Sequence, residues 1–224
     1  MLHIEVGVLK AANAAKAKHI CELIDYGSSK PDYVFVVMTL LFKDLHKLRS
    51  EMPDRRFGLS TSLRLSMQAL RSGNVIPARK DIGWRGTTRY GSLTAHMRQD
   101  LGRRDDLESW FYMTVEMTRG TLPWRLVTDR AAVQAAKQAA RAAGRIQFLF
   151  ETPKQFDQIL TMVDSYVFDS VPDYDKIYKI LDEAREEKGI RMTEHWDWEE
   201  ETSCSITTNT MNSLSEHDIK AKKE

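Results

Sequence analysis

Cysteine is scarce in this chain of 224 residues, with only Cys21 and Cys204 present. They lie far apart and in no Cys-x-x-Cys pattern, so neither a disulfide framework nor a cysteine-based zinc site is indicated. A reducing, intracellular setting is favoured. No run of 18 or more apolar residues occurs, which excludes a membrane-spanning helix. The N-terminus has no basic stretch followed by an apolar core, so we expect no signal peptide and a cytoplasmic location, with the nucleus as the alternative.

Net charge is low, at +1, but it is distributed unevenly. Residues 43–104 carry 14 Lys and Arg against 5 Asp and Glu, whereas residues 173–201 carry 5 against 11. The basic segment favours an anionic partner such as phosphate, an acidic peptide or nucleic acid. A solvated face, with long side chains covering apolar surface, is the alternative interpretation.

Hydrophobic patterning predicts a mostly α-helical protein with a small β contribution near the N-terminus. Gly144 and Gly189 stand where glycines commonly terminate helices. The expected elements are the end of a helix at 2–11, a buried strand at 33–41, helices at 43–51, 60–70, 105–117, 129–143, 153–164 and 173–188, and a loop at 71–92. The helix at 105–117 is apolar on nearly all sides, which indicates a buried central helix.

Two stretches are more specific than composition. Residues 86–92 read Gly-Thr-Thr-Arg-Tyr-Gly-Ser, and residues 103–112 read Arg-Arg-Asp-Asp-Leu-Glu-Ser-Trp-Phe-Tyr, followed by Gly-Thr-Leu-Pro-Trp at 120–124. Together they resemble the lower lobe of protein kinases in the casein kinase 1 superfamily, most closely the tau-tubulin kinase branch. The first stretch resembles the end of the family's activation segment, and the second resembles its helix F. Thr94 departs from the pattern, because the family usually has Asn there.

The resemblance implies an α+β kinase-like fold with a helical C-lobe and a reduced N-lobe. It divides the chain into a residual N-lobe at 1–42 (helix C, strands and hinge), a C-lobe at 43–200 that lacks the catalytic loop and the Asp-Phe-Gly segment, and a tail at 201–224 that we expect to be disordered. Glu5 matches the ion-pairing glutamate of helix C, Met38 the gatekeeper and Leu40 the hinge. These three residues would be the remnant of an ATP cleft.

Phosphoryl transfer by a kinase needs several parts at once: a Gly-rich loop, a strand lysine, a His-Arg-Asp catalytic loop and a metal-binding Asp-Phe-Gly. On this resemblance the chain begins at helix C, which leaves the first two parts without a counterpart. Neither His-Arg-Asp nor Asp-Phe-Gly occurs in the sequence. Only residues 71–85 lie where the catalytic loop, two strands and the metal-binding turn belong. We therefore assign no catalytic residue and no metal ligand.

Arg89 is the strongest candidate for a binding residue, because the matching arginine of the family helps to bind an anion near the substrate groove. A guanidinium can pair bidentately with phosphate or carboxylate, and Arg85 and Lys80 could support it. An exposed loop arginine without a binding role is the alternative. Structural roles follow from the family motif for five residues: Gly86, Thr87, Asp106, Pro123 and Trp124. In the family the aspartate matching Asp106 holds the catalytic loop, so we expect it to lack hydrogen-bond partners here.

These observations predict a kinase-like protein that does not transfer phosphate and instead binds a protein partner or an acidic or phosphorylated peptide. No cofactor is expected. The alternative is an active ATP- and Mg²⁺-dependent serine/threonine kinase whose sequence is incomplete. Nucleic-acid binding is the weakest hypothesis, because no aromatic stacking pattern accompanies the basic segment.

Overall fold

The computed structural model describes residues 2–17, 20–29, 33–41, 43–71 and 87–199. Helices predominate, with one antiparallel pair of strands near the N-terminus. In chain order the elements are α1 (Leu2–Ala14), β1 (Leu23–Ser29), β2 (Tyr33–Met38), α2 (Leu45–Glu51), the 3-10 helix η1 (Pro53–Arg55), α3 (Leu59–Arg71), α4 (Leu93–His96), α5 (Arg103–Arg119), α6 (Arg130–Ala139), α7 (Arg145–Phe148), α8 (Gln155–Ser165) and α9 (Tyr174–Glu187). The mostly α fold class with a reduced N-lobe is confirmed.

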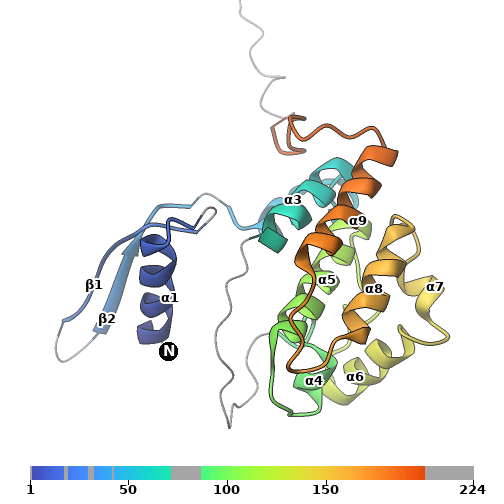
Figure 1. Cartoon of the computed structure of the whole chain (residues 1–224), viewed down its shortest axis with the longest axis horizontal. Coiled ribbons are helices and arrows are strands. Elements are labelled where there is room, and N and C mark those ends of the chain that lie inside the picture. The colour runs from blue at the N-terminus through green and yellow to red at the C-terminus, as the bar shows by residue number, and fades with distance from the viewer. Residues whose placement is uncertain (1, 18–19, 30–32, 42, 72–86, 200–224) are drawn as a thin grey trace, which may run out of the picture.

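Helix α1 and the β1–β2 hairpin form an N-terminal unit that lies to one side of the helical body (Figure 1). The strands pair in antiparallel register, with Gly27 opposite Phe35. Asn13 joins the helix to the hairpin, since its side-chain amide donates to the Cys21 carbonyl at 3.0 Å and its Oδ1 accepts from the Leu23 N–H at 2.6 Å. The division of the chain at residue 42 stays a prediction, as does the tail, which lies outside the described residues.

The prediction of a buried strand at 33–41 is wrong in its burial. Strand β2 forms there, but Val34 is 48% exposed and Val37 is 42% exposed. The reason is that a two-stranded sheet has two faces and α1 packs on the hairpin as a single layer (Figure 1). An apolar run of β-branched residues predicts a strand, but only a second layer would bury it.

The helical body is built around α5, and the prediction of a buried central helix is confirmed. Leu107, Phe111 and Val115 of α5 are almost completely buried. Helix α3 packs against both α5 and α9, and α8 packs against α5 and α9 (Figure 1). The Phe111 ring lies 6.2 Å from the ring of Phe148, edge to face, which adds aromatic contacts to the burial of apolar area.

Of the two glycines predicted to end helices, Gly189 does so and Gly144 does not, while Gly120 ends a helix without having been predicted to. Gly120, after α5, and Gly189, after α9, have φ of 84° and 67°, the left-handed conformation typical of a helix terminus. Gly144 has φ of −84° and instead precedes α7. Helix α6 already ends at Ala139, and the Gly144 N–H donates to the Ala139 carbonyl across the intervening turn. The expected helix at 129–143 is therefore shorter than predicted.

Strand β1 and the short helices α4 and α7 have no counterpart among the expected elements, because none carries a periodic apolar pattern of its own. Within the described ranges, no helix combines the length and apolar character needed to cross a bilayer.

Candidate anion-binding site

The segment that carries Arg89 is held from two sides. The Trp124 indole N–H donates to the Arg89 carbonyl at 2.8 Å. The Lys137 ammonium, from α6, donates to the carbonyls of Thr88 at 2.9 Å and Gly91 at 2.5 Å. Residues 87–91 have no helix or strand hydrogen bonds to fix them, so these contacts determine where the backbone of Arg89 lies.

Lys137 is fully buried, and its third close polar neighbour is His96 Nε2 at 3.1 Å. Burial lowers the pKa of Lys137 to about 7. Burial and the neighbouring Lys137 lower the pKa of His96 to about 4. His96 is therefore a neutral imidazole near pH 7, and a neutral ring nitrogen can accept a hydrogen bond from the ammonium.

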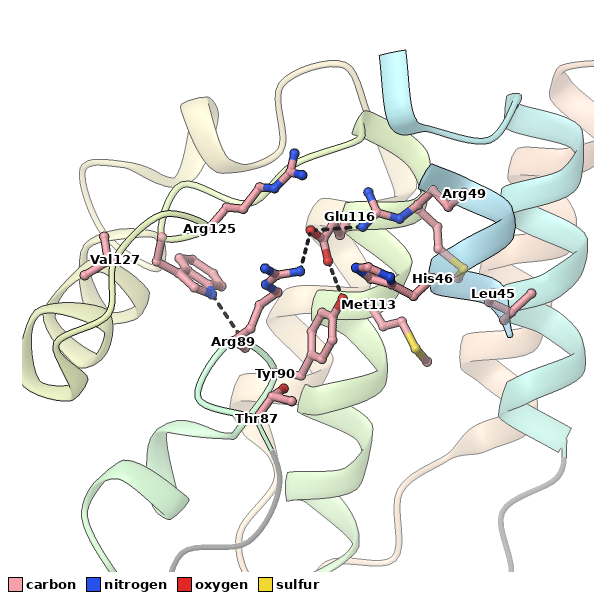
Figure 2. Close-up of a pocket in the computed structure, with 12 residues that line it drawn as sticks. Leu45, His46, Arg49, Thr87, Arg89, Tyr90, Met113, Glu116, Arg125 and Val127 are labelled. Atoms are coloured by element: carbon pink, nitrogen blue, oxygen red, sulfur yellow. Dashed lines mark hydrogen bonds and ion pairs between the residues drawn. The ribbon is translucent and has the colours of Figure 1, made fainter. Parts of the chain in front are cut away.

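Glu116, from the last turn of α5, is a second buried charged group beside this segment, with a side chain 1% exposed. Its Oε1 lies 3.4 Å from Arg49 Nη2 and 3.5 Å from Arg89 Nη1, and its Oε2 accepts a hydrogen bond from the Tyr90 hydroxyl. Figure 2 shows the two arginines reaching the carboxylate from different elements, α2 and the 87–91 segment. Burial and Glu116 raise the pKa of Tyr90, which keeps its hydroxyl protonated as the donor.

A cavity of about 530 Å³ lies between α2, the 87–91 segment and the segment that follows α5 (Figure 2). Its apolar lining includes Leu45, Met113, Met117, Trp124 and Val127. Its polar lining includes the Glu116 cluster described above. The cavity therefore combines an apolar interior with charged groups.

Arg125 also lines this cavity, and among the described residues its guanidinium makes no hydrogen bond or ion pair. Arg89, by contrast, is paired with Glu116, although its side chain is still 30% exposed. Arg49 is engaged on all sides, since it also donates to the carbonyls of Arg55 at 2.8 Å and Gly120 at 3.0 Å. Arg125 and the exposed part of Arg89 are thus the cations open to an anion.

The structure brings only part of the predicted site together. Arg89 and Thr87 line the cavity, and Trp124 positions Arg89 while Pro123 lies exposed beside it. Three predicted residues, Arg85, Lys80 and Gly86, lie outside the described residues.

The predicted remnant of the ATP cleft lies in the N-terminal unit, apart from this cavity. Glu5 is on α1, Met38 ends β2, and Leu40 follows it with almost its whole side chain exposed. None of them lines the cavity.

Asp106 forms no side-chain hydrogen bond among the described residues, as expected, but it is not the buried carboxylate of this turn. Asp106 is exposed at the start of α5, and the neighbouring Asp105 is the buried carboxylate. Asp105 Oδ2 accepts from the Gly102 N–H at 2.7 Å, whereas its Oδ1 has no hydrogen-bond partner among the described residues. The first turn of the helix places Asp105 inward and Asp106 outward, because adjacent residues are about 100° apart on a helix.

Sequence reasoning missed four residues of the site: Arg49, Glu116, Arg125 and Lys137. A charged residue among apolar neighbours was a signal for two of them, since Glu116 interrupts the apolar run of α5 and Lys137 interrupts the alanines of α6. Arg49 and Arg125 carry no such signal, because arginines are common in exposed segments.

Within the described ranges, no three His, Cys, Asp or Glu residues are grouped so that they could hold a metal ion.

The amino-acid sequence is similar to those of several serine/threonine-protein kinases. No protein-family model matches the chain. The chain is 29% identical to a probable serine/threonine-protein kinase of Dictyostelium discoideum, over 92% of this chain and 50% of the relative. It is 30% identical to the serine/threonine-protein kinase spe-6 of Caenorhabditis elegans, over 75% of this chain and 57% of the relative. Casein kinase I homolog 1 of Schizosaccharomyces pombe is 26% identical, over 55% of this chain and 28% of the relative.

The chain is therefore protein kinase-like. Its serine/threonine kinase relatives include casein kinase 1 homologues, which relates it to that superfamily. It spans about half the length of the curated relatives it matches.

The alignments also reveal an internal difference in length. The match to the Dictyostelium kinase runs over 253 positions but includes 92% of 224 residues, about 206, so about 47 positions have no counterpart here. The match to spe-6 runs over 216 positions and includes 75% of the chain, about 168 residues, which leaves about 48. Both relatives thus contain a similar number of residues within the aligned region that this chain lacks.

Proposed function

We propose that this chain is a kinase-like protein of the tau-tubulin kinase branch that binds a protein segment and does not transfer phosphate. The observation that carries the proposal is the short connection between α3, which ends at Arg71, and the segment at 87–91. The chemistry needs a catalytic base and a metal-binding aspartate in that interval. The sequence has neither His-Arg-Asp nor Asp-Phe-Gly anywhere. The positions that both relatives have and this chain lacks support the same interpretation.

The proposed ligand is an acidic or phosphorylated segment of a partner protein, bound at the basic surface around Arg89. Arg85 and Lys80, close in sequence, would add positive charge. On this proposal the protein needs neither ATP nor Mg²⁺, and its location is cytoplasmic. We do not propose nucleic acid as its partner, because no aromatic stacking pattern accompanies the basic segment in the sequence.

Binding of a fluorescent phosphopeptide to the full chain and to Arg89→Gln tests the proposal. We expect the variant to bind about tenfold more weakly, because a charge-assisted hydrogen bond contributes about 1.5–3 kcal/mol. Arg98→Gln is the matched control, since Arg98 is exposed on another segment. Equal binding by wild type and Arg89→Gln, with unchanged melting temperatures, would contradict the assignment of Arg89.

An active kinase with an incomplete sequence is the second candidate, favoured by the kinase relatives and by the missing internal positions. Sequencing the transcript across the codons for residues 70–86 separates the two. A longer message that encodes His-Arg-Asp and Asp-Phe-Gly would favour the active kinase. Transfer of labelled phosphate from ATP to a protein, dependent on this chain, would overturn the proposed inactivity.

A further inference from the structure

We propose that Lys137 and His96 make the 87–91 segment sensitive to acid: the closed segment keeps protons from this buried pair, and acidification favours an open form in which water reaches both side chains. This behaviour concerns how the segment is held, so it goes beyond the proposed function and does not depend on which ligand Arg89 binds. Three features support it: the burial of the pair, the lack of a carboxylate partner for Lys137, and the short distance between the two basic groups.

Lys137 is buried beneath the segment that it holds. Helix α4, which carries His96, packs against α6, which carries Lys137 (Figure 1). The Lys137 ammonium donates to the carbonyls of Thr88 and Gly91, and its side chain is completely buried. Because these carbonyls cover the nitrogen, water reaches it when the 87–91 segment moves away from α6.

Lys137 has no carboxylate partner among the described residues, although an acidic side chain lies nearby. Glu108, on α5, is engaged by others, since its Oε1 lies 2.8 Å from Arg141 Nη2 and accepts from the Tyr112 hydroxyl at 2.6 Å. The rings of Tyr112 and Trp124 lie 4.9 Å and 5.5 Å from the Lys137 nitrogen and add only cation–π contacts. Burial disfavours the charged form of Lys137, Glu108 favours it and Arg141 opposes it, and the pKa of Lys137 is lowered to about 7.

His96 stands where a second positive charge would face the first. Its Nε2 lies 3.1 Å from the Lys137 nitrogen, and two cations at this distance repel each other strongly where water is excluded. Burial, Lys137 and Arg130 disfavour the charged ring, whereas the Thr88 carbonyl favours it, and the pKa of His96 is lowered to about 4. In water the ordinary pKa values are 10.5 for the lysine and 6.5 for the histidine. An open form therefore binds more protons than the closed form between these limits, so a fall in pH shifts the equilibrium toward opening.

Hydrogen exchange of the full chain measures the opening. The amides of Tyr90 and Gly91 donate to the Thr87 carbonyl at 3.3 Å and 3.2 Å, so both exchange when the segment opens. After correction for the pH dependence of the chemical step, we expect their exchange to become roughly 50-fold faster between pH 9 and pH 7, because opening takes up nearly one proton at Lys137. Amides of α5, in the core of the helical body, should exchange more slowly at every pH. Exchange at Tyr90 and Gly91 that does not change with pH, or that matches α5, would overturn the proposal.

Replacement of Lys137 separates its titration from its packing. Lys137→Met keeps an unbranched side chain but removes the titrating group, so exchange at Tyr90 and Gly91 should lose its dependence on pH between pH 9 and pH 7, whatever its absolute rate. Lys179→Met, at an exposed position on α9, is the matched control and should keep the wild-type dependence. An unchanged pH dependence in Lys137→Met would contradict the role of Lys137.

A carbon-13 NMR titration of the lysine side chains in the wild type gives the answer if Lys137→Met does not fold. We expect one lysine to titrate near pH 7, well below the ordinary value of 10.5. A full set of lysines that titrate near 10.5 would overturn the proposal.

Discussion

The N-terminal unit and the helical body use similar apolar side chains with opposite results. In the helical body, apolar residues of α3, α5, α8 and α9 share one core of buried side chains. In the N-terminal unit, Val6 and Ala12 of α1 are buried, whereas Ile24 is 63% exposed and most of β2 is exposed as well. The difference lies in the number of layers, because α3, α5, α8 and α9 each pack against at least two other helices of the body (Figure 1).

Charged side chains are also buried in the helical body and exposed in the N-terminal unit. The body buries Arg49 against Glu116 and surrounds both with further partners. In the N-terminal unit, Lys10 contacts the Tyr26 hydroxyl at an exposed position. A buried charge is costly without partners, so a region can hold one only where several elements converge to supply them. In the helical body, α2, α5 and the 87–91 segment meet around Glu116, and the candidate site lies at that meeting point.

The largest expected effect comes from Phe111→Ala in the core of the helical body. Phe111 is fully buried against Phe148 and Phe156, so its truncation should lower the free energy of unfolding by about 3–5 kcal/mol. Ile24→Ala in the N-terminal unit is the counterpart and should change it by less than about 0.5 kcal/mol. Urea unfolding, followed by tryptophan fluorescence, measures both. Similar losses of unfolding free energy for the two variants would refute the contrast in burial between the helical body and the N-terminal unit.

Arg49→Met tests the buried ion pair and should have the next largest effect. Its removal leaves the carbonyls of Arg55 and Gly120 without this donor and takes one cation from Glu116, at a cost of about 3 kcal/mol. Lys10→Met removes the exposed contact of the N-terminal unit and should cost less than about 1 kcal/mol. The same unfolding measurement applies. A loss below 1 kcal/mol for Arg49→Met would mean that the cluster contributes little to stability.

Near neutral pH the smallest effect should come from His96, whose contribution to stability depends on pH. Its pKa is about 4 in the folded protein, below its ordinary 6.5, so the unfolded chain binds a proton that the folded chain does not over this interval. Stability should therefore fall as pH is lowered from about 6.5 to about 4. His96→Gln should show a shallower fall in melting temperature over that range, and His195→Gln, at an exposed position, should match wild type. Identical profiles for all three would exclude His96 as a source of the dependence.

The sequence predicts the helices well because their signals are local. Asp44, Asp129 and Asp173 cap α2, α6 and α9 by accepting from backbone N–H groups three residues onward. The motifs at 86–92 and 103–124 also indicate the kinase relationship, which the comparisons bear out. The site is less predictable: Arg89 can be identified from its motif, but its pairing with Glu116 cannot, since that contact joins residues far apart in the sequence.

The amino-acid order by itself determined where the longer helices form, where the central helix lies and which family the chain resembles, because periodicity, capping and motif are properties of neighbouring residues. Only the tertiary structure decided that β2 is exposed, that Asp105 rather than Asp106 is buried, and that Arg89 is paired with Glu116 while Arg125 has no side-chain partner among the described residues. Burial and pairing depend on which distant elements come together, and no pattern within one segment contains that information.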